Sequence, residues 1–157
     1  MTKSIALPAG KVALDDGTYT DVSVRQGRWL VLYAYPKDST PGCTQEANDF
    51  RDVHDKFLAL DTDVFGLSRD SVASHARFRS KQALPFPLIS DPEEVLCQHL
   101  DLIQEKVLYG KRYLGLVRST FLFDPTGICR AVWSPVKVKG HAQHVLEKLQ
   151  QLRHSNA

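Results

Sequence analysis

The feature that most constrains the fold lies between Trp29 and Phe57, where an apolar run gives way to a helical pattern. Residues 28–35 are almost all apolar, which is typical of a central strand buried on both faces. Pro36 ends this run, and apolar residues at helical spacing then predict a helix over residues 41–60. The first turn of this helix contains a cysteine, so we expect a thiol where a buried strand passes into a helix.

The rest of the chain alternates between strand and helix patterns. The sequence predicts a hairpin over residues 11–20, strands over 63–67, 88–89, 119–123 and 128–133, and helices over 71–82, from Asp91 onward and after Gly140. The helix from Asp91 is expected to carry an apolar stripe of Leu96, Leu100 and Ile103, and residues 104–117 are predicted to form a loop. This alternation indicates an α/β fold with a central mixed β-sheet flanked by helices, in one domain spanning residues 1–157.

Composition and charge narrow the classes of function. The formal net charge of +2 gives no reason to expect a nucleic acid or a membrane surface as a partner. No apolar run approaches the roughly 18 residues of a transmembrane helix, and the amino-terminal residues lack the apolar segment of a signal peptide. The three cysteines are too few and too widely spaced for a disulfide framework or a Cys-x-x-Cys pair. We therefore expect a soluble cytoplasmic protein with at least one working thiol.

Cys43 is the candidate for that thiol. If Thr40 is the N-cap and Pro41 the first helical residue, Cys43 occupies the third helical position. Unpaired backbone N–H groups and the positive end of the helix dipole favour an anion there, and so favour a reactive thiolate. The alternative is a buried, inert cysteine, because Cys43 shares the apolar face of the helix with Ala47 and Phe50.

The residues around Cys43 carry a resemblance to a known family. The string PKDSTPGC at residues 36–43 matches the PxxxTxxC active-site motif of the peroxiredoxins. The longer string YPKDSTPGCTQEANDFRD resembles the subfamily called bacterioferritin comigratory protein, or PrxQ. Further segments resemble that subfamily in the same order: FPLISD at 86–91, RSTFLFDPTG at 118–127 and VKVKGH at 136–141. The resemblance therefore covers most of the chain.

This resemblance implies a thioredoxin-like fold and a thiol peroxidase that reduces hydrogen peroxide and organic hydroperoxides without a cofactor. Cys43 would be the peroxidatic cysteine, whose thiolate attacks the peroxide bond and becomes a sulfenic acid. Thr40 would bind the peroxide through its hydroxyl, Pro36 would shield the pocket from water, and Arg118 would stabilise the thiolate and hold the peroxide. The backbone N–H groups of Gly42 and Cys43 would donate further hydrogen bonds. Without the resemblance, the same side chains suggest a helix cap, a strand end and a surface charge.

The sequence departs from the subfamily at the resolving cysteine. Many members have it five residues after the peroxidatic cysteine, where this chain has Asn48, and others have it in the next helix, where residues 75–82 contain none. Cys97 and Cys129 lie on apolar patterns that indicate packing. We therefore favour a one-cysteine mechanism in which glutathione, a glutaredoxin or thioredoxin resolves the sulfenic acid. The alternatives are a disulfide from Cys43 to Cys97 after local unfolding, and an intermolecular disulfide through Cys129.

Three smaller expectations complete the hypothesis. Glu46 lies one turn after Cys43, where an unpaired carboxylate would disfavour a thiolate, so we expect it to pair with an arginine or a backbone donor. His141 and His144 share a helical face but lack a third ligand, so no metal centre is predicted. Members of the subfamily are often monomers, so the resemblance implies a monomer. The competing function is a redox sensor or binding module that signals to a partner through oxidised Cys43 with little turnover.

Overall fold

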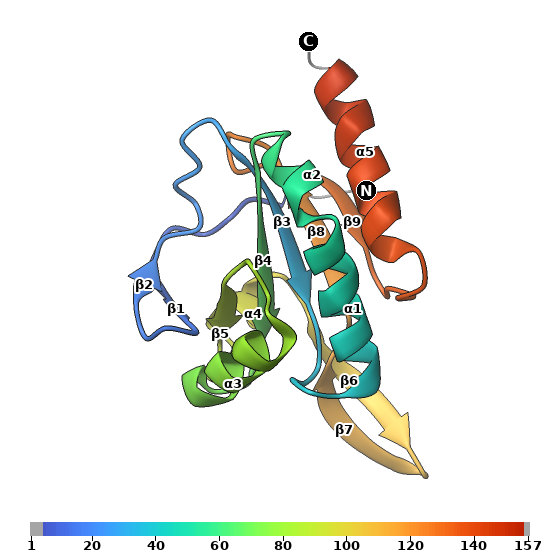
Figure 1. The fold of residues 1–157 in the computed structure, drawn as a ribbon. Helices are drawn as coiled ribbons and strands as arrows, with labels where there is room; N and C mark the ends of the chain where they lie inside the picture. Colours follow the sequence, from blue (N-terminus) through green and yellow to red (C-terminus); the bar gives the residue numbers. More distant parts are fainter. Residues whose placement is uncertain (1–4, 156–157) are drawn as a thin grey trace.

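A central β-sheet organises the chain, and the computed structural model describes it within residues 5–155. In this range the sheet has seven strands, in the order β2-β1-β5-β4-β3-β8-β9 (Figure 1). β3 pairs in parallel with β4 and antiparallel with β8, so the sheet is mixed, as predicted. The strand bounds are β1 Val12–Leu14, β2 Tyr19–Thr20, β3 Trp29–Ala34, β4 Thr62–Ser68, β5 Leu88–Ser90, β8 Ser119–Phe123 and β9 Cys129–Trp133.

The apolar run of the sequence forms β3, in the interior of the sheet, and all six of its residues are buried. Successive side chains of a strand point to opposite faces, so β3 contributes to two separate cores. The cluster that contains Val31 and Tyr33 is named here the first core. The cluster that contains Leu30 and Leu32 is named the second core. The sheet therefore divides the apolar interior into two parts.

Helices cover both faces of the sheet. Their bounds are α1 Pro41–Asp52, α2 His54–Leu58, α3 Val72–Gln82, α4 Val95–His99 and α5 His141–Ser155. α1, α2, α3 and α5 pack side chains into the first core, and α4 packs into the second. α1 and α5 lie side by side along the sheet (Figure 1). The helices and the mixed sheet together form the predicted α/β architecture.

The helix predicted over residues 41–60 is divided in two. Val53 leaves helical geometry with φ −112° and ψ 9°, and α2 begins at the next residue. The carbonyl of Val53 accepts hydrogen bonds from the N–H groups of Lys56 and Phe57, and these bonds start α2. The break lets Phe50 and Phe57 both reach the first core, where their ring centroids lie 6.1 Å apart.

The prediction of a loop over residues 104–117 is wrong. These residues belong to an antiparallel hairpin of β6 Ile103–Leu108 and β7 Lys111–Leu116, which projects past the amino end of α1 (Figure 1). Tyr109 and Gly110 both have positive φ, as a two-residue type I′ turn requires. Most of the hairpin is exposed, so its sequence lacks the alternation of apolar and polar residues by which a half-buried strand is recognised.

The fourth helix is shorter than predicted. α4 ends at His99, because Asp101 adopts a left-handed conformation with φ 56°. The N–H of Leu102 then donates to the carbonyl of Cys97 at 2.9 Å, a bond that closes a helix end. Ile103 therefore leaves the expected apolar stripe of the helix and begins β6 instead.

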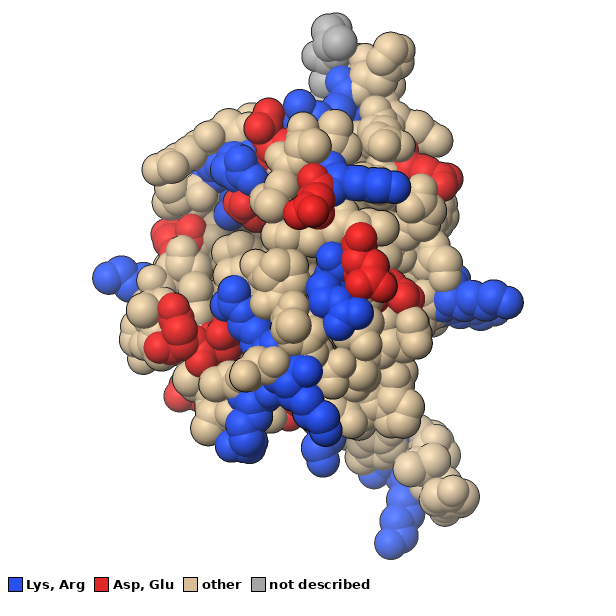
Figure 2. Space-filling view, in the orientation of Figure 1, with Lys and Arg blue, Asp and Glu red and all other residues tan. Residues whose placement is uncertain are grey.

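The surface carries charges of both signs. Figure 2 shows Lys and Arg interspersed with Asp and Glu over the face drawn, while the tip of the projecting hairpin is mostly uncharged. The exposed apolar residues of this hairpin are Val107, Leu108, Tyr109, Tyr113 and Leu114. Among residues 5–155, none of the helices has the length and apolar character that a membrane crossing requires.

Candidate active site

Cys43 lies in the first turn of α1, at the carboxyl end of β3. The helix begins at Pro41 with Thr40 as its N-cap, so Cys43 occupies the third helical position, as predicted. Its side chain packs in the first core, and the residue is only 1% exposed. The first turn contains no acidic residue to oppose an anion. The start of α1 therefore provides unpaired N–H groups that can bind a sulfur anion, and the surroundings are otherwise apolar.

Arg118 reaches Cys43 from the segment just before β8. Its Nη2 donates to the Sγ of Cys43 at 3.3 Å, and its Nη1 donates to Oε1 of Glu46 at 2.7 Å. Burial alone would lower the pKa of Arg118, but Glu46 and Cys43 outweigh this effect and raise the pKa above its ordinary value. A fixed positive charge thus lies against the sulfur although 75 residues separate the two side chains in the chain.

Glu46 pairs with an arginine, as the sequence analysis expected. The residue is 1% exposed, and only Oε1 receives the hydrogen bond from Arg118. Among the described residues, Oε2 of Glu46 is one of two buried side-chain oxygens without a hydrogen-bond partner, and the hydroxyl of Tyr33 is the other. Burial raises the pKa of Glu46 to about 7, although Arg118 acts in the opposite direction. This carboxyl group therefore changes charge near neutral pH.

The hairpin supplies a second cation that the sequence analysis missed. Lys106 of β6 donates from Nζ to the carbonyl of Leu116 at 2.7 Å, which holds its side chain against β7. Partial burial lowers the pKa of Lys106, and the neighbouring charges of Arg118 and Arg69 add to this effect, while Cys43 opposes it. No signal pointed to Lys106, because the hairpin that positions it was itself predicted to be a loop.

The remaining predicted site residues surround Cys43 in the chain. Pro36 lies two residues after the end of β3 and is partly exposed. The hydroxyl of Thr40 makes no capping bond and donates instead to the carbonyl of Lys37 at 2.9 Å, which leaves its oxygen able to accept. A Cβ atom added at Gly42 would lie 3.3 Å from Nη2 of Arg118. Glycine at this position therefore allows the guanidinium group to lie close over the helix start.

The other two cysteines lie on the opposite side of the sheet. Cys97 is fully buried in the second core, and Cys129 packs against that core. Burial, reinforced by Asp91, raises the pKa of Cys97 far above its ordinary value, and burial also raises the pKa of Cys129. Both groups are therefore held as thiols, away from the first core that contains Cys43.

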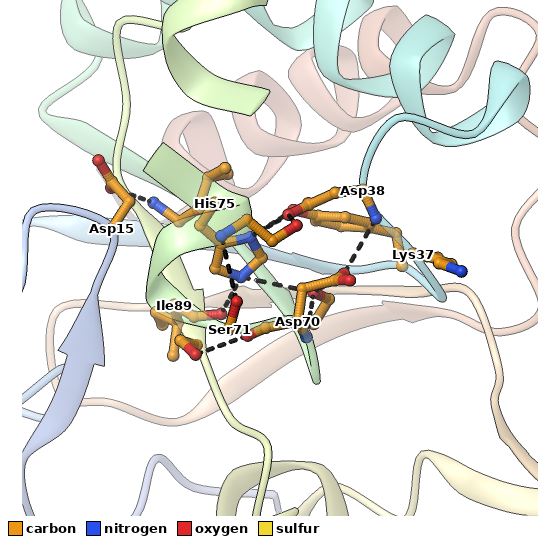
Figure 3. A network of polar contacts seen from close by, with 12 residues as sticks. Asp15, Lys37, Asp38, Asp70, Ser71, His75 and Ile89 are labelled. Atoms are coloured by element: carbon orange, nitrogen blue, oxygen red, sulfur yellow. Dashed lines mark hydrogen bonds and ion pairs between the residues drawn. The ribbon is translucent and has the colours of Figure 1, made fainter. Parts of the chain in front are cut away.

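A buried polar network behind the site also escaped the sequence analysis. It centres on His75 of α3 and on Asp38, which lies in the loop of residues 36–40 between β3 and α1 (Figure 3). Nδ1 of His75 lies 2.7 Å from Oδ2 of Asp38, and both residues are buried. His75 lies three residues before buried Phe78 in an otherwise polar helix, and this spacing is the signal that indicates an inward-facing histidine.

The network does not have the properties of a metal site or of a hydrolytic triad. Asp38, Asp70 and His75 group their ligand atoms closely enough for a metal ion, but these atoms already make hydrogen bonds within the protein. Ser68, His75 and Asp38 neighbour one another in space in the serine, histidine, aspartate order of a hydrolytic triad. The Ser68 hydroxyl, however, donates to Asp70 at 2.6 Å. Nε2 of His75 faces the carbonyl of Ile89 at 2.9 Å, and Ser68 is itself fully buried. A hydrogen-bonded core network describes these contacts better.

The arrangement around Cys43 suits attack by a thiolate on a small electrophile. Arg118 places positive charge beside Sγ, and the start of α1 adds backbone N–H donors. Donors of this kind can also stabilise negative charge that develops on a leaving oxygen. The geometry therefore agrees with the role that the motif suggests.

Comparisons with known proteins identify the family. Residues 4–132 match the AhpC/TSA family. The chain is 49% identical to peroxiredoxin Bcp of Xanthomonas campestris over 138 residues, which is 88% of this chain and 86% of the relative. It is 44% identical to peroxiredoxin Bcp of Bacillus subtilis, again over 138 residues and 88% of each chain. A solved structure of the Xanthomonas campestris bacterioferritin comigratory protein superposes with a TM-score of 0.89 at 46% identity, covering 94% of this chain and 96% of the other. The chain belongs to the AhpC/TSA family, with the fold of the thioredoxin-like peroxiredoxins, and within that family to the Bcp/PrxQ thiol peroxidases.

Proposed function

We propose that this peroxiredoxin reduces hydrogen peroxide and organic hydroperoxides by a one-cysteine mechanism centred on Cys43. The observation that carries the proposal is the 3.3 Å contact between Nη2 of Arg118 and the Sγ of Cys43 at the start of α1. The Xanthomonas campestris relative is described as having alkyl peroxide reduction activity, which supports organic hydroperoxides as substrates.

The reaction begins when the thiolate of Cys43 attacks one oxygen of the peroxide. A sulfur–oxygen bond forms, the oxygen–oxygen bond breaks, and the leaving oxygen takes up a proton and departs as water or an alcohol. Arg118 is proposed to hold the peroxide and neutralise the developing charge, with help from the N–H groups of Gly42 and Cys43. Thr40 is proposed to accept a hydrogen bond from the peroxide, and Pro36 to limit the access of water.

An external thiol is proposed to complete the cycle. It attacks the sulfenic acid of Cys43 and releases water, and a second thiol reduces the resulting mixed disulfide and restores the Cys43 thiol. The location of Cys97 and Cys129 in and against the second core supports this route, because the sheet separates both from Cys43. Glutathione, a glutaredoxin and thioredoxin are the candidate reductants, and the protein is proposed to act as a monomer.

Mass spectrometry after one equivalent of peroxide tests the mechanism. We expect a sulfenic acid on Cys43, and a mixed disulfide at the same residue once glutathione is added. Variants Cys97→Ser and Cys129→Ser should give the same products. An internal disulfide that disappears in Cys97→Ser would contradict the one-cysteine mechanism.

Steady-state peroxide consumption tests the activity itself. We expect turnover with glutathione and glutaredoxin or with thioredoxin, and its loss in Cys43→Ser. Equal peroxide consumption by Cys43→Ser would refute the assignment of this cysteine. Oxidation of Cys43 without turnover by any of these reductants would favour the redox-sensor function instead.

A further inference from the structure

His75 is fully buried and lies beside the active-site loop. Its Nε2 lies 2.9 Å from the carbonyl oxygen of Ile89, which can only accept, so Nε2 must carry a proton. Its Nδ1 lies 2.7 Å from Oδ2 of Asp38. Burial alone would raise the pKa of Asp38, but hydrogen bonds from His75 and Tyr35 outweigh it and lower the pKa below its ordinary value. Both ring nitrogens of His75 therefore lie against oxygen atoms, and the ring is held from two sides (Figure 3).

Asp38 joins the active-site loop to three different elements. Its Oδ1 accepts from the hydroxyl of Tyr35 at the end of β3, at 2.6 Å. Its Oδ2 accepts from the Ser74 hydroxyl of α3 at 2.8 Å, besides the bond to His75. Its backbone N–H donates to Oδ2 of Asp70, just after β4, at 2.9 Å. One buried residue of the loop is thus held on every side by short polar contacts.

The residue next to Asp38 shows that the loop needs this support. Ser39 has φ 65°, a left-handed conformation that costs a non-glycine residue on the order of 1 kcal/mol. Such a conformation persists where the surrounding structure fixes it. Ser39 joins anchored Asp38 directly to Thr40, the N-cap of the helix that carries Cys43. The position of Thr40 therefore depends on where Asp38 is held.

We propose that His75 and Asp38 are positioning residues for the peroxidase reaction: their buried hydrogen bond fixes the loop of residues 36–40 so that Thr40 and the start of α1 are aligned for attack by Cys43. This inference rests on the proposed function, since it concerns the same reaction. Among the hydrogen bonds of residues 5–155, those of His75 and Asp38 do not include the sulfur of Cys43. The two residues act through the backbone between Asp38 and Cys43. A displacement of this backbone by even 1 Å would misalign the reacting groups and lower the rate by about 100-fold.

The test compares two reactions of the same thiol. Reaction with peroxide needs the aligned donors, whereas alkylation by iodoacetamide needs only an accessible thiolate. For His75→Gln we expect the rate constant for peroxide to fall by about 10- to 100-fold, with less than about a threefold change in alkylation. Tyr35→Phe removes one bond to Asp38 without leaving an unpaired charge, so it should fold normally and lose about three- to tenfold in the peroxide reaction alone.

Controls separate positioning from general stability. His54 is also buried, but it lies in α2, more than three turns along from Cys43, so His54→Gln should lower stability and leave both rates unchanged. The double variant Asp38→Asn, His75→Gln should lose no more than the larger of the two single-variant losses, because His75 acts through Asp38. If folded His75→Gln or Tyr35→Phe reacts with peroxide as fast as the parent, the positioning role is wrong. A parent protein that shows no peroxide reaction would instead refute the proposed function.

Discussion

At the scale of single residues, Gly42 shows how a missing side chain shapes the site. A Cβ atom here would lie 3.3 Å from Nη2 of Arg118, so the guanidinium group that contacts Cys43 would have to shift by a few tenths of an ångström. For Gly42→Ala we expect about a tenfold lower rate constant with peroxide. Alanine favours a helix over glycine, so stability should stay equal or rise by up to about 1 kcal/mol. Stopped-flow oxidation and urea unfolding measure the two effects, with exposed Gln45→Ala as the control in the same helix. Oxidation of Gly42→Ala at the parental rate would contradict this role.

Glu46 makes stability depend on pH. Its pKa in the folded protein is about 7 against an ordinary value of 4.5, so the folded state binds more protons between these values. Stability from this group is present below the lower pKa and is lost as pH rises through the upper one. Relative to Glu46→Gln, the parent should lose on the order of 3 kcal/mol between about pH 4.5 and pH 8. Urea unfolding of both proteins in a Cys43→Ser background excludes the titration of the thiol. A constant difference across this range would show that Glu46 ionises normally.

At the scale of elements, the sequence predicted best where one physical signal dominated. The apolar run of β3, Pro36 and the helix start around Cys43 all followed from burial, proline geometry and capping. The hairpin of β6 and β7 did not, because largely exposed strands carry no apolar alternation. The role of Arg118 beside Cys43 was implied by the family resemblance, since local patterns contain no information about side chains that only the fold brings together. The pair of His75 and Asp38 stayed hidden for the same reason.

α1 also determines what a resolving cysteine at position 48 would require. Residues five apart in an α-helix have Cα atoms roughly 8.7 Å apart, too far for a disulfide. The variant Asn48→Cys can therefore form a bond to Cys43 only if the first turns of α1 unwind. We expect peroxide to produce this internal disulfide together with a loss of far-UV helical signal, and Asn48→Ser to show neither. The side-chain oxygen of Asn48 accepts a hydrogen bond from Nη1 of Arg51. The same nitrogen also donates to the carbonyl of Gln82, at the end of α3, at 2.8 Å. A disulfide that forms with no loss of helix would contradict the required unwinding.

At the scale of the whole molecule, the sheet separates the proposed reactive cysteine, Cys43, from Cys97, which only packs in the core. Cys43 lies in the first core at a helix start, beside the charge of Arg118, while Cys97 lies in the second core behind the sheet. Burial on that side raises the pKa of Cys97, so its thiol is both inaccessible and unreactive in the folded state. The two thiols should therefore become available through different motions, one local to the start of α1 and the other requiring the whole fold to open.

Labelling with iodoacetamide under increasing urea distinguishes these two motions. We expect Cys43 to be modified in the native protein and Cys97, which is fully buried, to be modified only through global unfolding. The free energy obtained from the labelling rate of Cys97 should then equal the free energy of unfolding from circular dichroism, with the same dependence on urea. Peptide mass spectrometry assigns each label, and a Cys43→Ser variant checks that modification at one site does not expose the other. If Cys97 were labelled in native buffer as fast as Cys43, the second core would open locally, and a resolving role for Cys97 would regain a physical basis.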